Sequence, residues 1–165
     1  MDQDVEKYRR WIRVGANIRS ASIFYLAKGI IDKLGDEGTA LVVEQIKEMG
    51  RNSGKRMRQS FEKQGLDNSF KNYSGRVSSD DIVYRFAWEG STPVETDEER
   101  VVEYTYCPIA EGFKMLGAEG VKVGELFCNN IDDAVIQAYN PEFECVRKSS
   151  LNRDGLCRLH FKKKQ

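Results

Sequence analysis

The chain has little of what marks a specialised protein class. Its 165 residues include three prolines, two tryptophans, four cysteines and a single histidine. The longest apolar stretch, residues 21–31, contains Lys28 and is too short to cross a bilayer. The N-terminus lacks a signal-peptide layout, and free thiols are more typical of such a chain than disulfides. We therefore expect a cytoplasmic protein that does not insert into membranes.

Neither sign of charge dominates. The chain carries 26 basic and 26 acidic residues, which gives a formal net charge of zero. A neutral balance gives no general reason to expect nucleic acid or an anionic membrane as a partner. We expect the short basic tail, residues 161–165, to be solvated. A small molecule is the expected ligand. The sequence leaves open whether the chain forms a homo-oligomer.

Standard catalytic and metal motifs are also missing. No two cysteines lie two to four residues apart, as structural zinc sites prefer. There is no P-loop, no dinucleotide-binding fingerprint and no G-x-S-x-G motif. Any site must therefore be found from less regular constellations of residues.

The hydrophobic pattern predicts an α+β fold in a single domain, 1–165, with a helical part at 1–66 and a mixed part at 80–165. N-terminal helices should pack on an antiparallel sheet, with two further helices between its strand pairs. We expect helices at 4–34, 39–61, 108–117 and 121–139, and strands at 82–89, 100–106, 142–149 and 156–163. Residues 65–79 and 90–99 are expected as loops, and 152–155 as the turn of the last hairpin. A small-residue face around Gly50 and Gly54 predicts close contact between helices.

Two cysteines are followed by a carboxylate one helical turn later. Cys107 precedes Glu111, and Cys128 precedes Asp132. This spacing would place each pair on one helix face. A thiol beside a carboxylate can serve a nucleophile, a proton relay or a metal. Asp133 points about 100° away from Asp132 on a helix and is expected to be solvated.

Cys107 falls where a predicted strand meets a predicted helix, with Pro108 at the first helical position. Unpaired N–H groups and the helix dipole stabilise an anion at such a place. Cysteines there have a lowered pKa and react more readily. Cys107 is accordingly the candidate nucleophile, although a buried cysteine that merely caps the helix stays an alternative.

Cys157 is expected on the inward face of its strand with Leu159 and Phe161. Arg158 and His160 should then point outward, so the Cys-x-x-His spacing is not expected to hold a metal.

The fourth cysteine, Cys145, is expected opposite Lys162 in the last hairpin, with Cys157 opposite Ser150. A disulfide between the two cysteines is not expected, and Cys145 should lie outside the site.

These residues predict a pocket that holds Cys107, Glu111, Cys128, Asp132 and Cys157, which could be catalytic or could bind a metal. The three cysteines would favour zinc or iron, with Glu111 or Asp132 completing the ligand set. Either carboxylate could move a proton in a hydrolysis. Candidate arginines for a substrate carboxylate are Arg147 and Arg158, although a surface position is expected for both.

The pattern of residues 100–163 resembles the L-2-amino-thiazoline-4-carboxylic acid hydrolase family. The matching elements are Cys107-Pro108 to Leu116-Gly117, then Cys128, Asp132, Tyr139-Asn140-Pro141, the turn at Asp154-Gly155, and Cys157. The first half matches only loosely. The resemblance implies a hydrolase of a non-peptide carbon–nitrogen bond that opens a thiazoline ring to give an N-carbamoyl cysteine. It also adds Tyr139 to the pocket.

The same hairpin is similar to that of the 4-vinyl reductase small-molecule-binding domain. This second resemblance implies a different class of function, a sensor or carrier that binds a small molecule or a metal without turnover.

Overall fold

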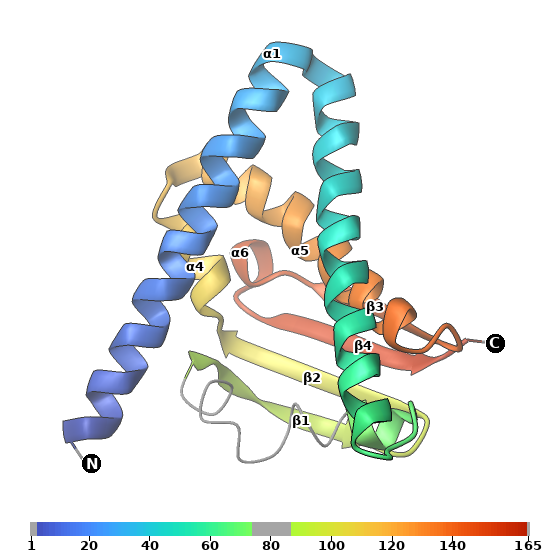
Figure 1. The fold of residues 1–165 in the computed structure, drawn as a ribbon. Coiled ribbons are helices and arrows are strands. Elements are labelled where there is room, and N and C mark those ends of the chain that lie inside the picture. Colours follow the sequence, from blue (N-terminus) through green and yellow to red (C-terminus); the bar gives the residue numbers. More distant parts are fainter. Residues whose placement is uncertain (1–2, 74–86, 165) are drawn as a thin grey trace.

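The computed structural model describes residues 3–73 and 87–164 (Figure 1). The helices are α1 (Gln3–Lys63), α4 (Pro108–Lys114), α5 (Gly117–Tyr139) and the one-turn α6 (Leu151–Asp154). The strands are β1 (Glu89–Glu95), β2 (Glu99–Tyr106), β3 (Phe143–Ser149) and β4 (Cys157–Lys163).

The long helix α1 consists of two arms joined at a sharp kink. Gly35 has φ 59° and ψ −129°, a region that only glycine enters readily. The two arms diverge from this kink and run toward the sheet, and α4 and α5 pack against them (Figure 1). The two predicted N-terminal helices are therefore confirmed. The boundary between them is Gly35, directly after the predicted end of the first helix at residue 34.

The four described strands form an antiparallel sheet in the order β1-β2-β4-β3. The helices lie over one face of this sheet (Figure 1). Between β2 and β3 the chain makes α4 and α5, as the sequence predicted. The α+β class is confirmed.

The first strand differs from the prediction. Most of the predicted strand 82–89 lies outside the described residues, and β1 occupies Glu89–Glu95, where we expected a loop. Gly90 and Pro93 made this segment look like a turn. Edge strands tolerate both residues at bulges, and the pairing with β2 shifts register beside each of them.

From Phe143 to Arg147 the last hairpin is one residue out of the predicted register, so that Cys145 pairs with Phe161 rather than Lys162. After a register shift between Arg147 and Ser149, Ser149 pairs with Arg158 as the prediction requires. The connection is the short helix α6 instead of a tight turn. Ser150 caps it by accepting a hydrogen bond from the Asn152 N–H, and Gly155 ends it with φ 69°.

Small residues bring the helices close together. A Cβ added to Gly54 would lie 2.2 Å from the carbonyl oxygen of Val135, and one added to Gly50 would lie 2.7 Å from the Ala134 Cβ. The predicted close contact is thus made with α5. On the first arm, the buried Ser20 hydroxyl donates to the carbonyl of Ile109 at 3.0 Å and ties α1 to α4.

Candidate functional site

A cavity of about 170 Å³ lies between the helical layer and the inner face of the sheet. Its polar and sulfur-bearing lining residues are Arg100, Cys107, Cys128, Asp132, Arg147 and Cys157. Aromatic and aliphatic residues complete the wall, among them Trp88, Tyr104, Phe127 and Leu159. Three of the predicted cysteines and one of the two predicted carboxylates therefore meet at one cavity.

Cys107 follows the last residue of β2 and is the N-cap residue of α4, in an extended conformation with φ −136° and ψ 118°. Burial raises the pKa of its thiol. The N–H groups of Ile109 and Ala110 and the Trp88 side chain favour the thiolate but do not overcome burial. The prediction of a lowered pKa was wrong because burial in an apolar wall outweighs the helix N-terminus.

Cys128 and Asp132 share one face of α5 and both line the cavity, as their spacing predicted. Burial raises the pKa of the Asp132 carboxyl from 3.8 to about 6, although the Arg147 charge lowers it. No ion pair or hydrogen bond joins the carboxyl to another residue in the described ranges, 3–73 and 87–164. Asp132 thus faces the cavity as an acid that titrates near neutrality.

Arg147 reaches the cavity from the opposite wall. Its Nε donates to the Ser149 carbonyl at 3.2 Å, and its guanidinium charge lowers the pKa of Cys128. Burial nevertheless raises the pKa of Cys128 to about 12. The expected surface position was wrong for Arg147. Two-residue alternation from Phe143 through Cys145 was the sequence signal that places it on the inner face.

Arg100 is a second cavity arginine, and it was not among the predicted site residues. It is buried on β2, its guanidinium donates to the Thr92 hydroxyl at 3.5 Å, and Glu95 lies 3.8 Å from its Nε. Alternation with Val102 and Tyr104 on the inner face could have revealed it.

Cys157 points inward from β4, as predicted, and burial raises its pKa to about 11. Arg158 and His160 point outward and meet Glu103 and Glu99, respectively. The side chains of Cys157 and His160 therefore point to opposite faces of the sheet, as the alternation of a strand requires.

Cys145 does not line the cavity, although it packs in the same core cluster as Cys157. All four thiols are free.

Two predicted site residues do not reach the cavity. Glu111 is partly exposed, and its carboxylate forms an ion pair with Lys114 Nζ at 2.8 Å. Because Cys107 has extended rather than helical backbone, the four-residue spacing does not align the two side chains. Tyr139 is fully buried in the core, where its hydroxyl donates to the Ser69 carbonyl at 3.1 Å.

Asp133 is not a solvated bystander. Its Oδ1 accepts the backbone N–H of Cys145 at 2.9 Å, and its Oδ2 accepts from Gln137 at 2.6 Å. It therefore fastens α5 to β3 beside the cavity. This contact lies between distant elements, so helical spacing could not predict it.

Within the described parts of the chain, no group of three or more His, Cys, Asp or Glu side chains is arranged to hold a metal ion. The three cysteines come from three different parts of the chain: Cys107 lies before α4, Cys128 on α5 and Cys157 on β4. The zinc or iron site predicted at Cys107, Cys128 and Cys157 thus gains no support from the geometry.

The sequence matches the L-2-amino-thiazoline-4-carboxylic acid hydrolase family over residues 16–161. The chain belongs to this family. The matched span of this hydrolase-family chain contains every cavity residue named above, and it extends far beyond the C-terminal half in which the resemblance was first seen. No curated protein sequence matches it significantly.

Among solved structures, a trafficking protein particle complex subunit 3 from Naegleria fowleri, covalently bound to palmitic acid, has the same fold. The TM-score is 0.56 at 14% sequence identity, over 92% of this chain and 96% of the other. At that identity the likeness shows the fold alone. No helix in the described portion is long and apolar enough to span a bilayer.

Proposed function

We propose that the protein hydrolyses a small cyclic amidine that carries a carboxylate, with L-2-amino-thiazoline-4-carboxylate as the first substrate to test. The observation that carries the proposal is the pair formed by Asp132 and Arg147. They face one cavity, Asp132 from the helical layer and Arg147 from the sheet, and the charge of Arg147 lowers the pKa of Asp132. Membership of the hydrolase family supports the same substrate class.

The two charges match the two ends of such a substrate. Arg147 would bind the carboxylate, since a guanidinium recognises that group through two parallel hydrogen bonds. Asp132 would face the amidine, whose N–H groups are donors. The cavity is small, about 170 Å³, which favours a compact ring over a long chain.

Asp132 is suited to be the general base. A carboxyl whose pKa is about 6 is mostly ionised at neutral pH and still returns a proton readily. It would take a proton from water as the water oxygen bonds to the amidine carbon. The ring then opens, and the same carboxyl would give the proton to the leaving atom.

Atom balance identifies that leaving atom. An N-carbamoyl cysteine keeps both nitrogens of the amidine, so the bond that breaks is the one between the ring carbon and sulfur. The electron pair leaves with sulfur, which becomes a thiol after it gains the proton from Asp132. The second hydrogen of the water ends on the former ring nitrogen as the added hydroxyl becomes the carbonyl of the carbamoyl group. This step replaces the carbon–nitrogen cleavage expected from the sequence.

Cys107, Cys128 and Cys157 would line the site as neutral thiols, because burial raises the pKa of all three. The thiolate is the reactive form of cysteine, and little of it exists at neutral pH under these conditions. The proposed reaction therefore uses water rather than a cysteine as the nucleophile.

Turnover of L-2-amino-thiazoline-4-carboxylate tests this assignment. Asp132→Asn should lose at least about 10²-fold in kcat, the lower end of what a positioned base contributes. Cys107→Ser should keep most of the activity. A Cys107→Ser variant as inactive as Asp132→Asn, together with a trapped covalent adduct on Cys107, would instead favour the thiol mechanism.

Binding without turnover is the second candidate function. The subunit of the same fold is covalently bound to palmitic acid, so a protein of this architecture holds a small molecule. The neutral thiols and the absence of a metal cluster in the described residues are also compatible with a carrier. Saturable binding of the thiazoline by wild type, with no product formed, would select this function.

A further inference from the structure

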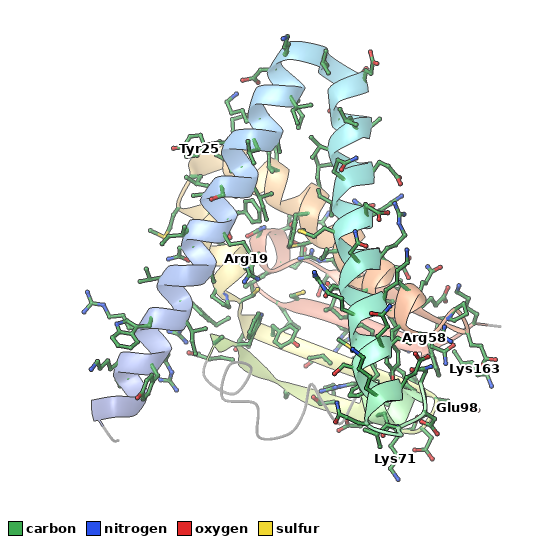
Figure 2. All side chains as sticks on the ribbon, in the orientation of Figure 1. Arg19, Tyr25, Arg58, Lys71, Glu98 and Lys163 are labelled. Carbon is green, nitrogen blue, oxygen red and sulfur yellow. The ribbon has the colours of Figure 1, made fainter. Side chains whose placement is uncertain are left out.

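The outer side of the first arm of α1 carries large apolar side chains that stay uncovered. Exposed fractions reach 59% for Trp11, 63% for Ile18 and 67% for Tyr25. Figure 2 shows Tyr25 projecting from the side of the arm that faces away from the sheet. The outer face consists of Tyr8, Trp11, Val14, Gly15, Ile18, Ser22, Tyr25, Leu26 and Gly29. It contains no charged residue over this length.

No residue in the described ranges, 3–73 and 87–164, packs against the two glycines of the outer face. A Cβ added to Gly15 or to Gly29 would meet nothing within 4 Å. The Ser22 hydroxyl turns back onto its own helix and donates to the Ile18 carbonyl at 2.9 Å. Each glycine inside a helix costs roughly 1 kcal/mol relative to alanine. A benefit outside the single chain would account for both positions, since glycine permits another backbone to come close.

The large and small residues of this face are self-complementary. In an antiparallel pair of identical helices, positions whose numbers sum to 40 lie opposite each other when the two-fold axis passes beside residue 20. Trp11 then faces Gly29, Tyr25 faces Gly15, and Ile18 faces Ser22. A parallel pair in register would instead place Trp11 on Trp11 and leave glycine against glycine.

We propose that the outer face is the interface of a homodimer in which the first arms of two copies pack antiparallel. The exposed apolar side chains offer on the order of 700 Å² per chain, close to the ~800 Å² per partner that stable interfaces bury. Charge does not choose between the orientations, because a parallel pair would set Lys7 beside Lys7 and the antiparallel pair sets Lys7 level with Lys33. The orientation therefore follows from the large and small residues that face each other.

A membrane surface is the competing occupant, because Arg10 and Arg19 border the apolar face as they would in an interfacial helix. Glycines offer such a surface no apolar contact. Their placement opposite each large side chain has a use only against a second helix of the same sequence. The homodimer is therefore the occupant that the residues favour.

Light scattering of the full-length chain over a wide concentration range tests the proposal. The mass of the wild type should rise from 18.9 kDa to about twice that value. Gly29→Leu should raise the dissociation constant at least about tenfold, because leucine would occupy the space of the second copy's Trp11. The variant should fold at least as well as wild type, since leucine favours helix and nothing lies near the new side chain within one chain.

A compensating pair makes the geometry testable. Trp11→Ala alone should also weaken the dimer, whereas Trp11→Ala combined with Gly29→Leu should dimerise more tightly than either single variant. Ala40→Leu, an exposed small-to-large change on the second arm, is the matched control and should leave the mass unchanged.

Two results would overturn the proposal. One is a wild type that stays monomeric at every concentration. The other is a Gly29→Leu variant that dimerises as tightly as wild type. A monomer that sediments with anionic phospholipid vesicles, and loses this on Trp11→Ala, would reassign the outer face to a membrane surface.

Discussion

At the scale of single residues, Asp132 and Glu111 show how position decides the use of a carboxylate. Both follow a cysteine by four residues. Asp132 follows a cysteine inside α5, so both side chains share a helix face and a cavity. Glu111 follows a cysteine that lies before its helix, and it pairs with Lys114 on the partly exposed side.

The raised pKa of Asp132 should make the stability of the fold depend on pH. The carboxyl is neutral in both states below its ordinary pKa of 3.8. As pH rises toward about 6, the unfolded chain loses this proton while the folded chain keeps it, so the folded state loses stability across that window. Asp132→Asn removes this penalty and should raise the free energy of unfolding at pH 7 by roughly 2–3 kcal/mol.

Urea unfolding of both proteins at pH 4 and pH 7 measures the effect. The advantage of Asp132→Asn should be small at pH 4 and larger at pH 7. An equal difference at both pH values would mean that the carboxyl is not buried. Glu111→Gln is the matched control and should show no comparable gain at pH 7, because its carboxylate is paired and partly exposed.

At the scale of elements, the contact between the second arm of α1 and α5 depends on Gly50 and Gly54. These glycines let α1 come within van der Waals contact of the α5 backbone. Because Cys128 and Asp132 are on α5, this contact also sets the depth of the cavity. The helices are thus packed by small residues at the crossing and by large residues beside it.

Gly54→Ala should destabilise the fold by roughly 1–3 kcal/mol, the usual cost of overpacking, despite the better helix propensity of alanine. The new Cβ would lie 2.2 Å from the carbonyl oxygen of Val135. Thermal unfolding in dilute protein measures the change. Gly15→Ala, whose Cβ meets nothing within 4 Å, should instead be neutral or stabilising. Similar effects of the two substitutions would contradict the tight crossing.

At the scale of the whole molecule, the cavity is lined by two layers, one of helices and one of strands. Asp132 and Cys128 come from the helical layer, while Arg147 and Cys157 come from the sheet. A ligand that bridges Asp132 and Arg147 would therefore hold the layers together. Binding should appear as stability of the entire fold rather than of one element.

L-Thiazolidine-4-carboxylate, which keeps the ring and the carboxylate but lacks the amidine, can serve as the probe. At about 100 times its dissociation constant it should stabilise the wild type by ~2.7 kcal/mol, and a thermal shift would record this. Arg147→Gln should lose most of the shift, whereas Arg158→Gln, on the outer face of β4, should keep it. An unchanged shift for Arg147→Gln would remove it as the carboxylate anchor.

The amino-acid sequence by itself determined what depends on neighbours along the chain. Helical periodicity identified both arms of α1 and the shared face of Cys128 and Asp132. Two-residue alternation placed Cys157 inward and His160 outward. These features follow from the local geometry of helices and strands, which every sequence of that pattern must obey.

Only the tertiary structure decided what depends on distant residues. Burial between two layers raised the pKa of Cys107 against the effect of its helix. The register of β3 with β4 and the contact of Asp133 with Cys145 likewise arise between separate elements. Desolvation and strand pairing are set by packing in three dimensions, so no pattern within a single element contains them.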